Sequence, residues 1–220
     1  MPSGQGQPRG ADGRWIKGKT AGGVVGAALV AGLMAAANGA DVTTSVGTAL
    51  DTAGQSSVDA ETASSREAAK KGDEKEAWQR MALREIDRQV KNGLRCAVQS
   101  FGQVQQFFVN HPCKKLDQLV YALEDTNGNV IIGTVMWVTM PSGGEAEQLQ
   151  RVEDTYGTGD VTPFTSEILG LGGVKFTGQH YRSRLDGSLL VISETEPLRG
   201  QPSNQLLLDV ATVADVLPPL

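Results

Sequence analysis

Two pairs of apolar or alternating segments, each joined by a two-residue turn signal, mark the C-terminal half of the chain. In the first pair, Leu119, Tyr121 and Leu123 alternate with other residues. Asn127-Gly128 follows, and VIIGTVMWVTM (residues 130–140) then runs back. Asn-Gly is the preferred type I′ turn of a β-hairpin. Because the returning segment is apolar on both faces, it predicts a strand in the middle of its sheet.

A second hairpin is predicted further along the chain. The segments VKFTGQHYRSR (residues 174–184) and LLVISETE (residues 189–196) flank Asp186-Gly187, another two-residue turn signal. Each hairpin ends shortly before a proline, Pro141 in the first case and Pro197 in the second. Proline cannot continue a ladder of strand hydrogen bonds, so both sites predict the end of a strand.

The order hairpin, proline, helix occurs twice, over residues 117–156 and 173–217. The apolar positions at helical spacing are Ala146, Leu149, Val152 and Tyr156 in the first case, and Leu206, Val210, Val213 and Leu217 in the second. Two such ββα units predict an α+β domain. We expect one antiparallel four-stranded sheet with both helices on one face.

An amphipathic helix is predicted over residues 74–94. Its apolar positions recur every four residues, at Trp78, Ala82, Ile86, Val90 and Leu94. This spacing places them on one side of a helix, with charged residues around the rest. We expect this helix, with a further helical segment that ends at Pro112, to form a lid on the sheet. The stripe at residues 74–95 also offers a surface for self-association.

Ahead of this helix the chain changes composition several times. Residues 41–73 are rich in Ser, Thr, Ala, Asp and Gly and show no apolar periodicity. They predict a disordered stalk, because they cannot bury enough apolar surface to offset their chain entropy. The alternative for the second half, Ala60–Lys71, is a frayed helix. The expected organisation is a basic tail (1–20), a membrane or signal segment (21–40), a stalk (41–73) and an extracytoplasmic α+β domain (74–220).

The N-terminal region has the order of a signal anchor. Arg9, Arg14, Lys17 and Lys19 precede an uncharged run over residues 21–39. Basic residues on one side of an apolar segment keep that side in the cytoplasm, so we expect the domain to lie outside the cell membrane. The alternative is cleavage near Ala35-Ala36-Ala37 and secretion. The phosphate-loop pattern GRWIKGKT (13–20) has no core strand before it, so we interpret it as part of the basic flank.

Charge and cysteine content limit the partners and cofactors. The net charge of −5 argues against a nucleic-acid partner. Cys96 and Cys113 are the only cysteines in a chain expected to be exported, which predicts a disulfide. The alternatives are a metal site or a reactive thiol. Structural zinc needs four ligands and only His111 lies nearby, so we predict no metal and no other cofactor.

The most site-like segment is residues 180–184. Strand alternation places His180, Arg182 and Arg184 on one face and Tyr181 on the other. The candidate residues for a ligand or partner face are His180, Tyr181, Arg182, Arg184 and Glu194. Such a face suits an anionic ligand or an acidic protein. The alternative is structural, with the arginines paired across the hairpin to Glu194 and Glu196. No set of catalytic residues is predicted.

Three short segments resemble exported or membrane-anchored proteins of high-GC Gram-positive bacteria that have no assigned function. They are FTGQHY (176–181), NHPC (110–113) and VADVLPP (213–219). The resemblance implies an N-terminal anchor and a single extracytoplasmic domain, and it assigns no catalytic residues. From the order of basic tail, apolar run, stalk and domain, and from the lack of a catalytic set of residues, we expect a membrane-anchored extracytoplasmic binding or protein-interaction module without catalytic activity. The alternative is an exported hydrolase or sugar-modifying enzyme that uses the acidic and basic strand residues.

Overall fold

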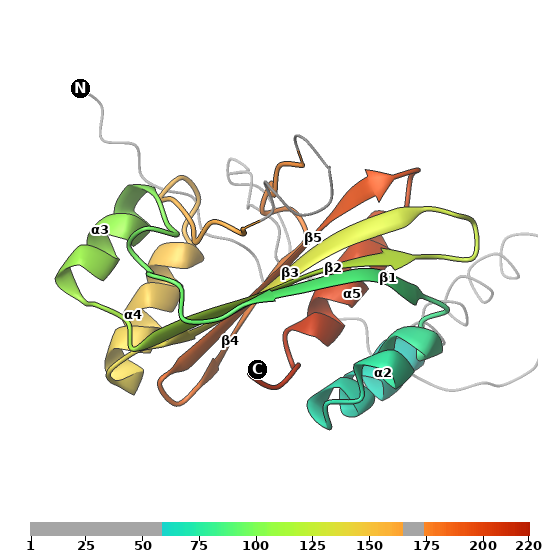
Figure 1. Cartoon of the computed structure of the whole chain (residues 1–220), viewed down its shortest axis with the longest axis horizontal. Coiled ribbons are helices and arrows are strands. Elements are labelled where there is room, and N and C mark those ends of the chain that lie inside the picture. The colour runs from blue at the N-terminus through green and yellow to red at the C-terminus, as the bar shows by residue number, and fades with distance from the viewer. Residues whose placement is uncertain (1–58, 165–173) are drawn as a thin grey trace, which may run out of the picture.

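The computed structural model describes residues 59–164 and 174–220, which form an α+β fold around one antiparallel sheet (Figure 1). The strands are β1 (Arg84–Lys91), β2 (Lys115–Glu124), β3 (Val130–Thr139), β4 (Tyr181–Asp186) and β5 (Leu189–Arg199). The helices are α2 (Glu74–Arg80), α3 (Gly102–Asn110), α4 (Gly143–Glu153) and α5 (Asn204–Ala214), and residues 59–70 are also helical. The five strands lie in the order β1-β2-β3-β5-β4.

Both predicted hairpins are confirmed. Strands β2 and β3 pair without interruption on either side of Asn127-Gly128, and Gly128 has the positive φ of 78° that favours glycine. The Asp125 carboxylate accepts hydrogen bonds from the amides of Asn127 and Asn129, which fixes this turn. The second hairpin joins β4 and β5 through Asp186-Gly187. Its predicted end before Pro197 was wrong, because β5 continues through this residue to Arg199, with a register shift in its pairing to β3. Strand β3 lies at the centre of the sheet, as its apolar character predicts.

The predicted four-stranded sheet with both helices on one face was wrong in two respects. A fifth strand, β1, pairs with β2, and the helices cover both faces. Odd-numbered residues of the central strands, such as Val135 and Val191, pack against α5 on what we call the α5 face. Even-numbered residues, such as Met136 and Ile192, pack against α3 and α4 on the α4 face. Because β3 and the first part of β5 (Leu189–Ile192) are apolar on both sides, each face needs a cover.

The continuous helix predicted over residues 74–94 was also wrong. Helix α2 ends at Arg80, Ala82 takes a positive φ of 54°, and the chain reverses into β1. A spacing of four residues does not distinguish the two structures, because positions i and i+4 share a face in a helix and also in a strand. In the folded chain Trp78 is buried, whereas Ile86 and Val90 are exposed on the edge strand.

Residues 59–70 fall in the segment predicted as a stalk, and they form a helix beside α5. Ala68 and Ala69 are buried in the core of the α5 face. The Arg66 guanidinium donates to the Thr212 carbonyl oxygen at 3.0 Å and lies 3.6 Å from the Asp215 carboxylate. The packed region therefore includes residues ahead of Glu74, where we placed the start of the domain. Small residues can pack closely on α5 without the large apolar side chains that the prediction required.

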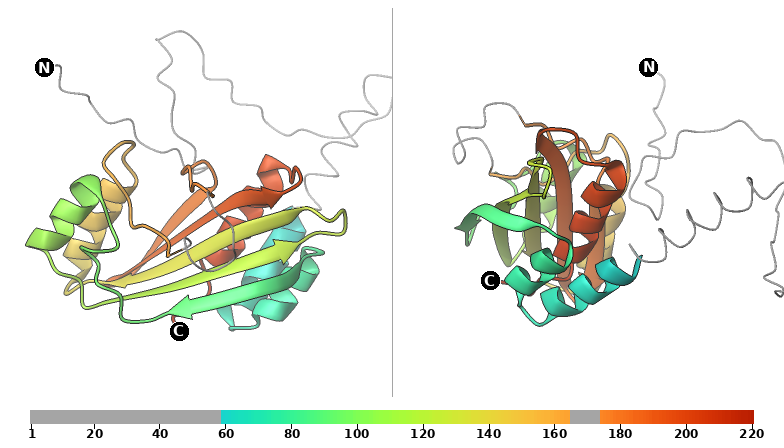
Figure 2. Two further views of the ribbon diagram at one scale, coloured as in Figure 1. Left: turned by 45° about the horizontal axis from the view of Figure 1, so that its top comes forward. Right: turned by 90° about the vertical axis from the view of Figure 1, so that its right-hand side faces the viewer.

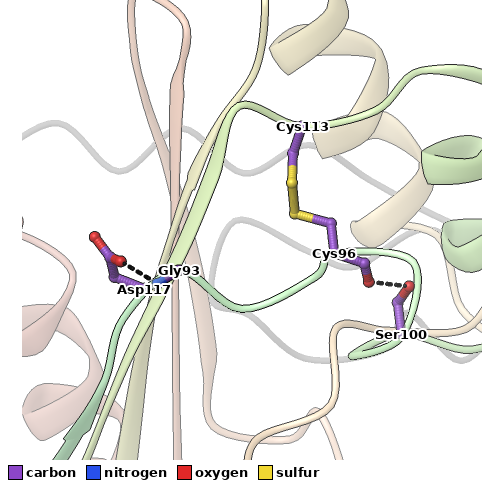
Figure 3. Close-up of a disulfide and its surroundings, with 5 residues drawn as sticks. All are labelled: Gly93, Cys96, Ser100, Cys113 and Asp117. Atoms are coloured by element: carbon purple, nitrogen blue, oxygen red, sulfur yellow. Dashed lines mark hydrogen bonds between the residues drawn. A yellow bond between two sulfur atoms is a disulfide. The ribbon is translucent and has the colours of Figure 1, made fainter.

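The predicted disulfide joins Cys96 and Cys113, whose Cα atoms lie 6.3 Å apart (Figure 3). It connects the segment after β1 to the segment before β2, so it closes the excursion that carries α3. The Ser100 hydroxyl donates to the Cys96 carbonyl oxygen, and the Gly93 amide donates to the Asp117 carboxylate (Figure 3). Cys96 packs with Val104 and Phe108 of α3 on the α4 face, whereas the Gly93 contact joins the end of β1 to β2.

The predicted membrane segment at residues 21–40 lies outside the described residues, as do the basic tail (1–20) and the first part of the predicted stalk. Within residues 59–164 and 174–220, the helices are too short or too polar to cross a membrane.

Candidate functional site

The predicted ligand face around β4 is covered by α5. The Arg182 Nε donates to the Thr212 hydroxyl at 2.9 Å, and the Arg184 Nε donates to the Asp215 carbonyl oxygen at 3.0 Å. His180 is buried, with its Nε2 3.3 Å from the Asn204 side-chain oxygen. Alternation therefore places the two arginines on one face, as predicted, and there they hold β4 to the helix above it.

Tyr181 and Glu194 lie on the α4 face. The Tyr181 hydroxyl donates to the Asp154 carboxylate at 2.9 Å, and the Gly178 amide donates to the Glu194 carboxylate. Glu194 is the cross-strand neighbour of Tyr181, while Arg182 lies opposite Ser193. The hairpin register therefore sends the side chains of Arg182 and Glu194 to opposite faces. The predicted cross-strand pairing of these two charges was wrong by one residue of register.

A cavity of about 670 Å³ lies elsewhere, between α2 and the edge strand β1 on the α5 face. It is lined by Gly72, Asp73, Glu74, Lys75, Trp78, Gln79, Leu83, Arg84, Glu85 and Arg88. We call it the α2–β1 cavity. Helix α2 and strand β1 lie side by side at this edge of the sheet (Figure 2). The volume falls in the range of about 300–1,000 Å³ that is usual for small-ligand sites.

The charged centre of this cavity is Arg88, which faces two carboxylates. Its guanidinium forms an ion pair with Glu74 from α2, and it lies 3.9 Å from the Glu85 carboxylate on its own strand. All three side chains are only partly exposed, between 20% and 32%. Burial lowers the pKa of Arg88, and burial together with the nearby charge of Asp87 raises the pKa of Glu85. One guanidinium therefore faces two carboxylates in a partly desolvated setting.

The floor of the cavity is aromatic and rigid. The Trp78 ring stacks on Tyr121 with the ring centroids 5.4 Å apart and an angle of 25° between the planes. Both side chains are buried, and Tyr121 in turn lies over Gly133 of β3, where any larger residue would meet its ring. Burial raises the pKa of the Tyr121 phenol well above its ordinary value, so it stays neutral. The layer Trp78, Tyr121, Gly133 fixes the position of α2 over the sheet.

This site was not predicted, because residues 74–94 were expected to form one helix. In a single helix Glu74 and Arg88 would be roughly 21 Å apart along the axis, at about 1.5 Å per residue. The reversal at Met81–Leu83 brings them into contact instead. Gly72 and Asp73, a glycine and a helix-capping residue just ahead of Trp78, mark where α2 starts. No comparable residue pattern indicates that α2 ends at Arg80.

A smaller cavity of about 230 Å³ lies between the helical residues 59–70 and α5. It is lined by Glu61, Thr62, Met81, Ser203, Gln205, Leu206 and Asp209. Burial raises the pKa of Asp209, although the Gln205 side chain donates to its carboxylate at 3.0 Å. Neither cavity is lined by His180, Tyr181, Arg182, Arg184 or Glu194. Across residues 59–164 and 174–220, no three His, Cys, Asp or Glu side chains are grouped so that they could hold a metal ion.

No protein-family model, curated protein or solved structure matches this chain.

Proposed function

We propose that this protein is a membrane-anchored extracytoplasmic binding module without catalytic activity, and that the α2–β1 cavity is its ligand site. The anchor rests on the order of the N-terminal residues, with basic side chains before the uncharged run at 21–39. The disulfide between Cys96 and Cys113 supports an oxidising location outside the cytoplasm. The binding role rests on the cavity itself.

The observation that carries the binding role is the combination of volume, aromatic floor and charged centre in one place. A ligand site is typically a concave surface with apolar walls and a few polar groups that fix orientation. Trp78 and Leu83 supply the apolar wall, while Glu85 and Arg88 supply half-buried charges. Burying charged groups costs stability unless they are well paired, and it is often accepted where they contact a ligand.

The alternative of an exported hydrolase required Arg182, His180 and Glu194 to converge in one cleft. Arg182 holds α5, His180 contacts Asn204 at the start of α5, and Glu194 points to the opposite face. An acid, a base and a substrate must share a space for general acid–base catalysis. The arrangement therefore favours binding over hydrolysis at these residues.

The binding role is tested by filling the cavity. Gln79 on α2 lines the cavity and is exposed, and Gln148 on α4 is also exposed but does not line the cavity. A mixture of small aromatic and cationic fragments is titrated onto the purified full chain and followed by ligand-observed NMR. We expect binding to the wild type and to Gln148→Trp, and at least tenfold weaker binding to Gln79→Trp. Equal binding by both variants, or no binding to the wild type, would overturn the proposal.

The location is tested separately in cells. The full chain carries a C-terminal tag, and protease is added to intact cells and to lysed cells. The proposed orientation predicts that the tagged domain is in the membrane fraction and is cleaved in intact cells. A tag that is protected in intact cells and cleaved only after lysis would contradict it.

A further inference from the structure

Strand β1 forms one edge of the sheet (Figures 1 and 2). It also borders the α2–β1 cavity. Its pairing with β2 is regular from Asp87 to Lys91, after an irregularity between Glu85 and Asp87. The Arg88 amide donates to the Asp87 side chain at 2.7 Å, which indicates that it points away from β2. Because strand amides alternate in direction, the Val90 amide points to the same outer side. An edge strand with such outward groups is a template for another strand.

The opposite edge of the sheet differs. Strand β4 is shorter, with six residues against the eight of β1. Both of its faces contact helices, α4 on one side and α5 on the other. The side chains of Arg182 and Arg184 are committed to α5. These two helices occupy the space on either side of a strand that would be added beside β4. A strand added beside β1 instead has a cavity on its α5 side.

We propose that β1 and the α2–β1 cavity together bind an extended peptide segment of a partner protein, which adds a sixth strand at β1 and places a lysine or arginine side chain in the cavity. This inference rests on the proposed binding role of the cavity. In strand addition, main-chain hydrogen bonds give affinity and pockets for alternate side chains give specificity. Arg88 and Val90 face the cavity side of the sheet, because they lie opposite Tyr121 and Leu119 of the α5 face. Alternate side chains of the added strand therefore enter the cavity.

A cationic side chain is the one that the cavity suits best. Glu74 and Glu85 face a single guanidinium, that of Arg88, so the half-buried centre has an excess of negative charge. Arg84, the other arginine in the lining, pairs with Glu124 at the rim. Asp73 and Lys75 also line the cavity, but both are exposed and their opposite charges offset each other. A lysine or arginine on the peptide would restore the balance at Glu85, and its aliphatic stem would lie against Trp78 and Leu83. Charge-assisted hydrogen bonds of this kind are stronger than neutral ones.

The edge also carries features that restrict which strands can pair with it. The irregularity between Glu85 and Asp87 and the charges of Arg88 and Lys91 prevent indiscriminate edge-to-edge association. The Asp87 carboxylate occupies the Arg88 amide until a better acceptor arrives. A peptide carbonyl can first accept a hydrogen bond from the Val90 amide. The remaining contacts then depend on the charges of the peptide side chains. The edge therefore selects by charge.

To test the inference, a display library of random twelve-residue peptides is panned against the purified full chain. The peptides that bind are then synthesised with their central Lys or Arg retained, or replaced by norleucine. We expect slowed hydrogen exchange at β1 amides in the complex and at least tenfold weaker binding of the norleucine peptides. We expect a similar loss for Glu85→Gln, and none for Glu147→Gln, a matched change on the exposed side of α4.

The backbone contribution is tested at Val90. Val90→Pro removes an outward amide and should abolish peptide binding, whereas Val90→Thr retains the amide and the β-branched shape and should preserve it. Circular dichroism and the thermal midpoint establish that each variant is folded. Peptides whose binding slows exchange at other strands, or binding that survives Val90→Pro in a folded variant, would overturn the inference. So would a dimer of the chain paired through β1.

The two proposals fail in different ways. If no peptide binds but fragments still occupy the cavity in a manner sensitive to Gln79→Trp, the strand-addition inference fails and the binding role stands. If neither peptides nor fragments bind, both fail.

Discussion

Gly133 of β3 supports the floor of the α2–β1 cavity, and replacing it with alanine tests the packing described above. Gly133 is the cross-strand partner of Tyr121, whose ring lies directly over it. A Cβ atom at this position would overlap the Tyr121 ring and hydroxyl. The ring cannot move outward freely, because Trp78 stacks on its other side and both side chains are buried. The alanine must therefore displace the whole aromatic layer.

Insertion of one methyl group into a tightly packed core typically costs about 1–3 kcal/mol. We expect a value near 2 kcal/mol for Gly133→Ala, since a rigid ring rather than a flexible chain must give way. In a domain of this size, each kcal/mol lowers the thermal midpoint by roughly 2–4 °C, so the midpoint should fall by about 4–8 °C. Gly144→Ala is the matched control, because its added Cβ meets nothing within 4 Å and it lies in α4.

The assay is urea denaturation of the full chain, followed by circular dichroism, as a double-mutant cycle with Tyr121→Leu. Leucine removes the ring that blocks the methyl group, so Gly133→Ala should cost less than about 0.5 kcal/mol in that background. Two results would contradict this packing: a neutral effect of Gly133→Ala in the wild-type background, or an equal cost with and without the Tyr121 ring. Either result would mean that the ring does not rest on Gly133.

Three further predictions concern the scaffold. Replacing both Cys96 and Cys113 with alanine should lower the free energy of unfolding by about 3 kcal/mol, since a disulfide closing a loop of this length restricts the unfolded chain by that amount; wild type and variant should have equal stability under full reduction, and a persistent gap would contradict this. Trp137→Phe removes the indole donor to the buried Leu217 carbonyl oxygen, which lies 3.1 Å away. The loss should lower the free energy of unfolding, measured by urea denaturation, by about 2 kcal/mol. An unchanged urea midpoint would show that this contact does not fix the C-terminal segment. Burial raises the pKa of the Asp209 carboxyl. This group therefore favours the folded state at low pH and loses that contribution as pH rises above its unfolded pKa of about 3.8. The stability of Asp209→Asn relative to wild type should increase from pH 4 to pH 7, and a constant difference across this range would argue against the shift.

Local sequence determined the hairpins and most of the helices of this protein. Asn127-Gly128 and Asp186-Gly187 specify tight turns through their own backbone preferences, so no distant contact is needed to locate them. The helical spacing at Ala146 and at Leu206 likewise predicted α4 and α5. The disulfide followed from cysteine number and expected location. The hairpins and helices depend on neighbours within a few residues, which is why pattern alone sufficed for them, whereas the disulfide could be predicted because the chain has only two cysteines.

The tertiary structure decided which faces are covered and where the candidate site lies. The apolar character of β3 on both sides implied two covers, but the choice of α5 for one face and α3 with α4 for the other depends on chain connections of long range. Strand alternation correctly predicted which face His180, Arg182 and Arg184 share. It did not predict that α5 covers this face. Position on a strand is local, but exposure is a property of the whole fold.

The region from Glu74 to Lys91 shows the limit most clearly. Apolar residues four apart fit a helix and a strand equally, because both geometries return to the same face after four residues. The structure distinguishes the two by pairing β1 with β2 and by stacking Trp78 on Tyr121. These partners lie between 27 positions (Lys91 and Gln118) and 43 positions (Trp78 and Tyr121) further along the chain. The positions of Glu74, Glu85 and Arg88 along the chain did not indicate that they are neighbours. They meet around a cavity because the chain reverses at Met81–Leu83.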